Sequence, residues 1–192
     1  MLDLAFVNNN IPEKGKLLLS DPFMDEEFFR RAVVYICEYS EEGSFGFIIN
    51  NFLPLNLKDL GDKFPDIEAQ LSIGGPVDND NLYFLHTLGD QIDNAINVTD
   101  QVYLGGNFDQ LIELLKNDSS LLNQVRFFIG YAGWSKVQLE DELKENNWLV
   151  VNPPKLNDLF VKKTSISWKK LMKKQGEKFK FYANTPLNPS NN

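Results

Sequence analysis

Runs of apolar residues along the chain predict a strand-rich protein. The strongest strand covers 32–39, where both alternating faces are apolar, as in an interior strand covered on both sides. After a turn at 40–43 the chain returns over 44–50 as an antiparallel partner, and Gly46 within it predicts a bulge or a close backbone approach. Further strands are predicted at 16–20, 70–73, 82–86, 101–104, 125–129 and 148–151.

Helical periodicity is clearest after Asn107, a favourable N-cap residue that Gln110 follows at the third helical position. The apolar residues of 108–115 recur there at i, i+3, i+4 and i+7, which predicts an amphipathic helix. A shorter helix is predicted over 57–64, ended by Pro65. The segment 168–175 has a short apolar stripe with lysines opposite it.

The segment 127–149 combines several of these signals. It predicts a strand, a glycine-containing turn at 130–134, a helix that begins after Ser135, and a new strand at 148. Ser135 and Gln138 have the spacing of a capping box, and Trp134 and Leu139 that of a hydrophobic staple. The N–H groups at such a helix start suit an anionic or carbonyl ligand. The alternative, which these residues alone favour, is a tight turn that packs Trp134 against the sheet.

Length and composition predict one domain over residues 1–192, with an N-terminal extension at 1–14 and a basic segment at 155–192 that packs on the same domain. The chain has 192 residues, of which 43% are hydrophobic and 24% charged, as in a folded globular protein. The N-terminus lacks the basic and apolar regions of a signal peptide, and no apolar run is long enough to span a bilayer. We therefore expect a cytoplasmic protein without a membrane partner.

The charge is acidic overall but unevenly distributed. A net charge of −8 argues against direct nucleic-acid binding by the whole molecule. Nine lysines against two acidic residues lie between Lys155 and Lys180. The segment from Lys162 to Lys180 is therefore the one place where a phosphate-rich partner would be held.

Chemical motifs are few. The single histidine and single cysteine exclude a zinc site of the usual cysteine–histidine type within one chain, and no phosphate-binding or nucleophile motif is present. A Cys37–His86 pair is conceivable, but both residues fall inside predicted strands, where an apolar-face cysteine is usually core. The acidic loop at 21–27 lacks the ligand alternation of a calcium loop. We expect no metal and no cofactor, and we assign no catalytic residue.

Several blocks of the sequence, in order, resemble the AlgH/YqgE family of bacterial proteins. They are GKLLLSDP at 15–22, FRRAVVYICE at 29–38, GFIIN at 46–50, GGPV at 74–77, LH at 85–86, GYAGW at 130–134, QLE at 138–140 and NWL at 147–149. The resemblance implies an α+β fold whose mostly antiparallel, bent and bifurcated sheet forms a pseudo-barrel with flanking helices. Family members are cytosolic and often labelled transcriptional regulators, and no family-wide activity is established.

The chain departs from the family pattern at several positions. Tyr39 stands where a histidine is usual after the Cys-Glu pair, Ala32 replaces a serine or threonine, and Asn51-Phe52 replaces Arg-Pro. The losses of that histidine and arginine weaken any proposal that they act in catalysis across the family.

Three functions follow from the sequence. The favoured one is a non-enzymatic binding or regulatory protein with a small ligand or protein partner, using a pocket where glycine-bearing bends and polar strand ends converge. The second is an enzyme with Glu38 or His86 as general acid–base, and the third is nucleic-acid binding through Lys162–Lys180. The candidate pocket residues are Arg31, Glu38, Asn50, Gly74, Gly75, Pro76, His86, Gly130, Gly133, Trp134, Gln138 and Glu140.

Overall fold

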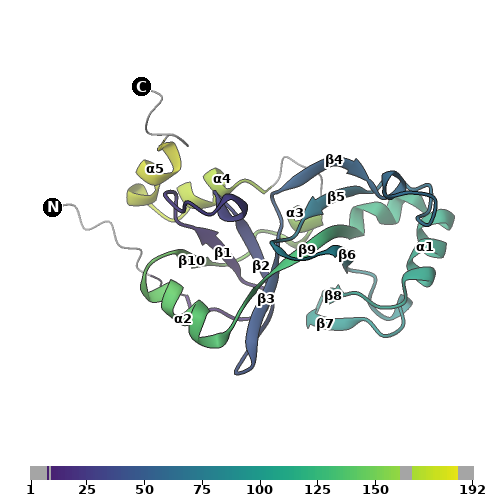
Figure 1. The fold of residues 1–192 in the computed structure, drawn as a ribbon, viewed down its shortest axis with the longest axis horizontal. Helices are drawn as coiled ribbons and strands as arrows, with labels where there is room; N and C mark the ends of the chain where they lie inside the picture. Colours follow the sequence, from purple (N-terminus) through teal and green to yellow (C-terminus); the bar gives the residue numbers. More distant parts are fainter. Residues whose placement is uncertain (1–7, 9, 161–165, 186–192) are drawn as a thin grey trace.

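The computed structural model describes residue 8 and residues 10–160 and 166–185. In this part the chain forms an α+β fold (Figure 1). The strands are β1 Leu17–Ser20, β2 Val33–Ser40, β3 Gly43–Ile48, β4 Phe52–Asn56, β5 Gln70–Ile73, β6 Val77–His86, β7 Ile96–Thr99, β8 Val102–Leu104, β9 Val125–Trp134 and β10 Trp148–Val151. The helices are α1 Phe108–Asn117, α2 Lys136–Lys144, α3 Leu156–Phe160, α4 Trp168–Lys173 and α5 Glu177–Asn184, with 3-10 turns η1 Glu27–Phe29, η2 Leu57–Leu60, η3 Gly89–Gln91 and η4 Ser119–Gln124.

The strands form one large sheet that divides at β9. Its main order is β10-β1-β2-β3-β9-β6-β8-β7, all antiparallel, and β5 joins β9 in parallel with β4 as its own partner. The first half of β9 pairs with β5, and its last three residues pair with β3. Along its opposite edge β9 pairs with β6. The predicted bifurcated, mostly antiparallel sheet is therefore confirmed. Within the described residues β10 and β7 do not pair with each other, so closure into a pseudo-barrel is not confirmed.

The predicted turn at 130–134 is wrong, because β9 continues through it to Trp134. Residues Ala132–Trp134 find backbone partners on β3, so the strand does not need to end where its partner β5 ends. Gly130 lies at this change of partner with φ of 66°, a left-handed conformation that suits glycine. A Cβ there would also stand 2.7 Å from the Val77 carbonyl oxygen and against the Asn79 side chain.

The β2–β3 hairpin matches the prediction and explains Gly46. A Cβ on this glycine would collide with the Tyr35 carbonyl oxygen, so the close backbone approach is confirmed. The bulge lies on the partner strand, because Ile36 opposes Gly46 and Glu38 opposes Phe45, which leaves Cys37 as the extra residue. Glu38 thus stands half-exposed where β2 leaves the core.

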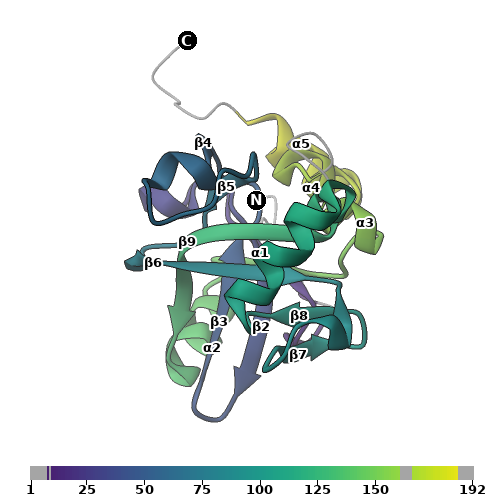
Figure 2. The ribbon, with the colours of Figure 1, turned by 90° about the vertical axis from the view of Figure 1, so that its right-hand side faces the viewer.

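Apolar side chains form three clusters, and different helices pack against each of them. Figure 2 shows these helices in separate places around the sheet: α1, α2, and the group of α3, α4 and α5. α1 packs its apolar face into the cluster of β5, β6 and β9, and the Asn107 side chain accepts the Gln110 N–H at its start, as predicted. α2 covers the cluster that contains Trp134 and Trp148. Helices α3, α4 and α5 pack on the largest cluster, which is shared by β1, β2 and β3.

Two strands were not predicted, and one predicted helix is shorter. β4 contains Pro54 and pairs only with β5, in an irregular register. It is therefore an edge strand, where a sheet tolerates proline. β7 lies at the other edge of the sheet. The helix predicted over 57–64 is the single 3-10 turn η2, followed by Gly61 with φ of 111°. No helix in the described part is long and apolar enough to cross a membrane.

Candidate functional site

A hollow of about 610 Å³ opens beside the β2–β3 hairpin, between that hairpin, β6, β8 and the end of β9. Its size is within the range of small-molecule sites. Its wall is mainly apolar and includes Ser135, the residue that caps α2. The lining residues are Glu38, Ser40, Glu42, Gly43, Ser44, Phe45, Phe47, Val77, Tyr83, Leu104, Tyr131, Gly133, Trp134 and Ser135.

Four aromatic rings form a closed circuit in this wall. The ring centroids of Phe45 and Phe47 are 6.3 Å apart, those of Phe47 and Tyr83 are 5.8 Å apart, and those of Tyr83 and Tyr131 are 5.7 Å apart. Tyr131 and Phe45 close the circuit at 5.9 Å with an edge-to-face geometry. Alternation along β3 and β9 places these rings on one face of the sheet, because every second side chain points the same way. Phe45, Tyr83 and Tyr131 are only partly buried.

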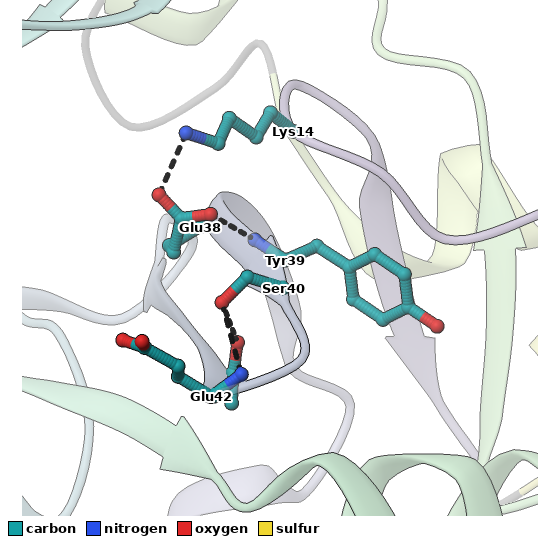
Figure 3. A network of polar contacts seen from close by, with 6 residues as sticks. Lys14, Glu38, Tyr39, Ser40 and Glu42 are labelled. Atoms are coloured by element: carbon teal, nitrogen blue, oxygen red, sulfur yellow. Dashed lines mark hydrogen bonds and ion pairs between the residues drawn. The ribbon is translucent and has the colours of Figure 1, made fainter.

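The charged residues that line the hollow are both acidic. Glu38 lies at the end of β2, where its Oε2 is 2.6 Å from the Lys14 Nζ and its Oε1 accepts the Tyr39 N–H at 3.1 Å (Figure 3). Glu42 lies in the hairpin turn, and its N–H donates to Ser40 Oγ, which in turn donates to the Gly43 carbonyl. Lys14 is the ion-pair partner of Glu38 but does not line the hollow.

A third carboxylate contacts the circuit from β6. The Tyr83 hydroxyl donates to Asp78, which also accepts from the Asn81 side chain at 2.8 Å. These hydrogen bonds lower the pKa of Asp78. Partial burial, together with the bond to Asp78, raises the pKa of Tyr83 to about 12, so the phenol stays protonated at neutral pH. The Asp78 backbone has φ of 57°, in the bulged part of β6.

Ser44 contributes a buried polar atom without a partner. The residue is 6% exposed, and among the described residues its Oγ has no hydrogen-bond partner. Ser44 pairs with Trp134, so its side chain lies on the face of the sheet that α2 covers, opposite the four rings. Buried hydroxyls are normally hydrogen-bonded because desolvation without a partner is costly. The Ser44 hydroxyl is therefore an exception beneath α2 and does not belong to the ring-lined part of the hollow.

Trp134 is among the lining residues, but its side chain packs with Leu139 and Trp148 under α2. Its Nε1 donates to Glu142 Oε2 at 2.9 Å, and the Trp148 Nε1 donates to the same oxygen at 2.7 Å. The Gln138 side chain donates to Glu142 Oε1 at 2.8 Å, so it does not complete the predicted capping box. Ser135 does cap α2 by accepting the Gln138 N–H. Glu142 is not among the residues predicted from the sequence, although its i,i+4 spacing from Gln138 on a predicted helix indicates the contact between them.

Of the twelve candidate residues, the structure places Glu38, Gly133 and Trp134 in the wall of this hollow. Gly74 and Gly75 instead allow the backbone to approach β9, since a Cβ on either would collide with Gly130 or Tyr131 backbone atoms. Pro76 does not line the hollow either, and the next residue, Val77, does. Gln138 and Glu140 lie on α2 outside the lining.

Arg31, Asn50 and His86 have other surroundings. The Asn50 side chain accepts the Val33 N–H at 2.8 Å and donates to the Arg31 carbonyl at 2.8 Å, which joins the chain at the ends of β2 and β3. The Arg31 guanidinium donates to the Thr185 carbonyl and lies 5.2 Å from the Trp168 ring centroid. These contacts connect the sheet to α4 and α5.

His86 is sealed in the core. It is fully buried, its Nε2 lies 3.0 Å from the Gly105 carbonyl oxygen, and its Nδ1 accepts the Leu88 N–H at 3.3 Å. Its ring stacks on Tyr103, and burial lowers the pKa of the imidazole. His86 therefore does not share the hollow that Glu38 lines. Burial likewise raises the pKa of Cys37 far above that of a reactive thiol.

A buried arginine was not selected from the sequence. Arg126 on β9 donates to the carbonyls of Ile49 and Leu159 and to Ser72 Oγ, and its guanidinium lies 4.7 Å from the Phe52 ring centroid. Burial lowers its pKa to about 9, so it remains charged at neutral pH. It connects β5, β3 and α3 where the sheet divides. The described residues contain no cluster able to hold a metal ion.

Comparison with known proteins places the chain in a family. The AlgH-like family model DUF179 matches residues 17–180. A UPF0301 protein of Bacteroides thetaiotaomicron is 39% identical over 186 residues, which cover 96% of this chain and 94% of the relative. The chain belongs to the AlgH-like family. A UPF0301 protein of Chlorobium limicola is 37% identical over 178 residues, 93% of this chain and 95% of that one.

Two solved structures agree with the AlgH-like assignment. The solution structure of AlgH from Pseudomonas aeruginosa has a TM-score of 0.62 at 27% identity, over 80% of this chain and 85% of that one. A crystal structure of a Corynebacterium diphtheriae protein has a TM-score of 0.73 at 23% identity, over 93% and 95% of the two chains, which shows a shared fold alone. The family resemblance read from the sequence blocks is confirmed. These matches establish family and fold but name no reaction or ligand.

Proposed function

We propose that this AlgH-like protein is a non-enzymatic binding protein whose ligand occupies the hollow between the β2–β3 hairpin, β6 and β9. The observation that carries the proposal is the hollow itself: about 610 Å³ of space against a circuit of four aromatic rings. Apolar walls with a few placed polar groups are typical of small-molecule and peptide sites. The protein would have a regulatory role if a bound ligand changed the conformation of the β2–β3 hairpin and thereby the binding of a partner.

The polar groups at the hollow suit binding rather than acid–base catalysis. Glu38 is engaged by Lys14, and His86 is buried in hydrogen bonds at another place in the sheet. A general acid–base pair must reach the same substrate position. The described geometry does not bring these two side chains to one cavity, so we do not propose catalysis by them.

Native mass spectrometry of freshly purified protein tests the proposal. We expect a fraction of the protein to retain a small molecule or a peptide segment. The variant Val77→Trp places an indole in the wall of the hollow and should lose that species. The matched control is Ile96→Trp on β7, an exposed aliphatic position outside the lining. Absence of any retained species from the wild-type protein, or equal retention by Val77→Trp, would contradict the proposal.

A further inference from the structure

We infer that the protein pairs with a second copy of itself through a face formed by α4, α5 and the segment between β1 and η1. This pairing face combines an exposed aromatic centre, basic side chains on α4 and acidic side chains at residues 25–27. None of these residues lines the hollow. The inference is therefore independent of the proposed ligand site.

Two exposed phenylalanine rings form the centre of the pairing face. Phe181 on α5 is 67% exposed, and Phe23, in the segment between β1 and η1, is 53% exposed. Their ring centroids lie 6.2 Å and 6.3 Å, respectively, from the centroid of Tyr182. Two parts of the chain that are distant in sequence thus share one aromatic surface. Exposed clusters of large apolar rings are typical of surfaces that bind another protein.

The solvent side of α4 is basic. Lys169, Lys173 and Lys174 are exposed there, and the opposite side of the helix packs Leu171 into the core. Helices α4 and α5 are neighbours in the fold, so the basic side chains belong to the same region as the rings (Figure 1). Among the described residues, none of these three lysines has an ion-pair partner.

The segment that contains Phe23 continues with acidic residues. Asp25, Glu26 and Glu27 are exposed, and within the described ranges of the chain none of them forms an ion pair. The pairing face therefore has unpaired charges of both signs around one aromatic centre. A uniformly acidic or uniformly basic partner would be repelled by part of this face.

A second copy satisfies both signs at once. In a dimer with two-fold symmetry, a residue that contacts a second residue of the partner is matched by the same contact in reverse. Rotation about an axis through the aromatic centre would place the α4 lysines of each copy against residues 25–27 of the other. The Phe23 and Phe181 rings would pack at the middle, where water is excluded. Charge complementarity therefore favours a second copy as the partner.

Sedimentation velocity of the full chain over a range of concentrations tests the inference. We expect a monomer–dimer equilibrium with a dissociation constant of roughly 10–100 μM, as for a small interface, and weaker association at high salt because the ion pairs are screened. Phe181→Ser should weaken the association at least about tenfold, because it removes an aromatic anchor. The matched control is Val137→Ser on α2, an apolar residue that is 65% exposed outside the pairing face, and it should leave the dissociation constant unchanged.

Charge reversal distinguishes a symmetric dimer from other kinds of association. One variant reverses the three lysines and a second variant reverses the three acidic residues. The substitutions are Lys169→Glu, Lys173→Glu and Lys174→Glu in the first, and Asp25→Lys, Glu26→Lys and Glu27→Lys in the second. Each variant alone should be monomeric, because like charges would meet on both sides of the axis. An equal mixture should form a heterodimer, because opposite charges then meet on both sides.

Circular dichroism of each variant checks that it is folded before it is tested. Wild-type protein that stays monomeric at about 0.5 mM, well above the expected dissociation constant, would overturn the inference. A dimer that Phe181→Ser does not weaken, or a mixture of the two charge-reversed variants that stays monomeric, would do the same. If monomeric protein instead shifts its α4 amide signals in NMR when a glutamate-rich peptide or a DNA oligonucleotide is added, the basic side chains belong to another partner and the inference fails.

Discussion

Replacing Glu142 with alanine should destabilise the protein strongly, although this charged residue of α2 is only half-buried. Its Oε2 accepts the Nε1–H groups of both Trp134 and Trp148, whose side chains are 6% and 0% exposed. Without the carboxylate, two buried indole N–H groups lose their acceptor. Each such loss costs about 1–3 kcal/mol.

We therefore expect Glu142→Ala to lower the free energy of unfolding by about 2–4 kcal/mol, since water reaches part of this site. For a chain of this length the loss corresponds to a fall in Tm of about 4–16 °C. The matched control is Glu140→Ala, which changes the same residue type two positions earlier on the same helix. It should cost no more than about 0.5 kcal/mol, as expected for a surface residue.

Urea unfolding followed by tryptophan fluorescence measures both variants. A double-mutant cycle with Trp148→Phe isolates the indole–carboxylate bond and should give a coupling of about 1–2 kcal/mol. If Glu142→Ala and Glu140→Ala are equally mild, the two indoles do not depend on this carboxylate, and the explanation given for the Trp134–Glu142 segment is refuted.

Three further predictions concern the sheet and the hollow. Gly130→Ala should lower the free energy of unfolding by more than about 2 kcal/mol in urea unfolding, because alanine would have to adopt a left-handed backbone next to the Val77 carbonyl. In the control Gly133→Ala the new methyl group meets only the movable Tyr131 ring, so the loss should be less than half as large. Burial lowers the pKa of His86 below its usual 6.5, so the unfolded chain binds the proton more readily than the folded protein. The contribution of His86 to the free energy of unfolding should therefore be fully present above pH 6.5 and should be lost as the pH falls below 6.5. NMR titration of this histidine, the only one in the chain, checks the direction, and a midpoint above 6.5 would be inconsistent with it. Ser44→Ala should leave the free energy of unfolding unchanged or raise it by up to about 1 kcal/mol in urea unfolding. A clear loss of stability would mean that the hydroxyl already has a partner.

Much of the fold could be predicted because its signals are local. The apolar run of β2, the hairpin return at Gly46 and the capped start of α1 each depend on neighbouring residues. The continuation of β9 past Gly130 could not be read in this way. A glycine with positive φ normally suggests a turn, and only the distant strand β3 supplies the backbone partners that keep Ala132–Trp134 extended.

The candidate site was predicted only in part for the same reason. Glu38 and Trp134 were selected as polar or aromatic residues at strand ends, and they do line the hollow. The ring circuit was not selected, because Phe45 and Tyr83 resemble ordinary core residues until the pairing of β3, β9 and β6 brings them together. His86 had a chemically suggestive side chain, but its neighbours fully satisfy it in the core.

Crystals soaked in turn with small cationic, neutral and anionic compounds test the central claim most directly. The claim is that the hollow beside the β2–β3 hairpin is a binding site. It predicts electron density for at least one compound in the hollow, against the Phe45 and Tyr131 rings. A hollow that stays empty in every soak, or that is closed by its own side chains, would contradict it.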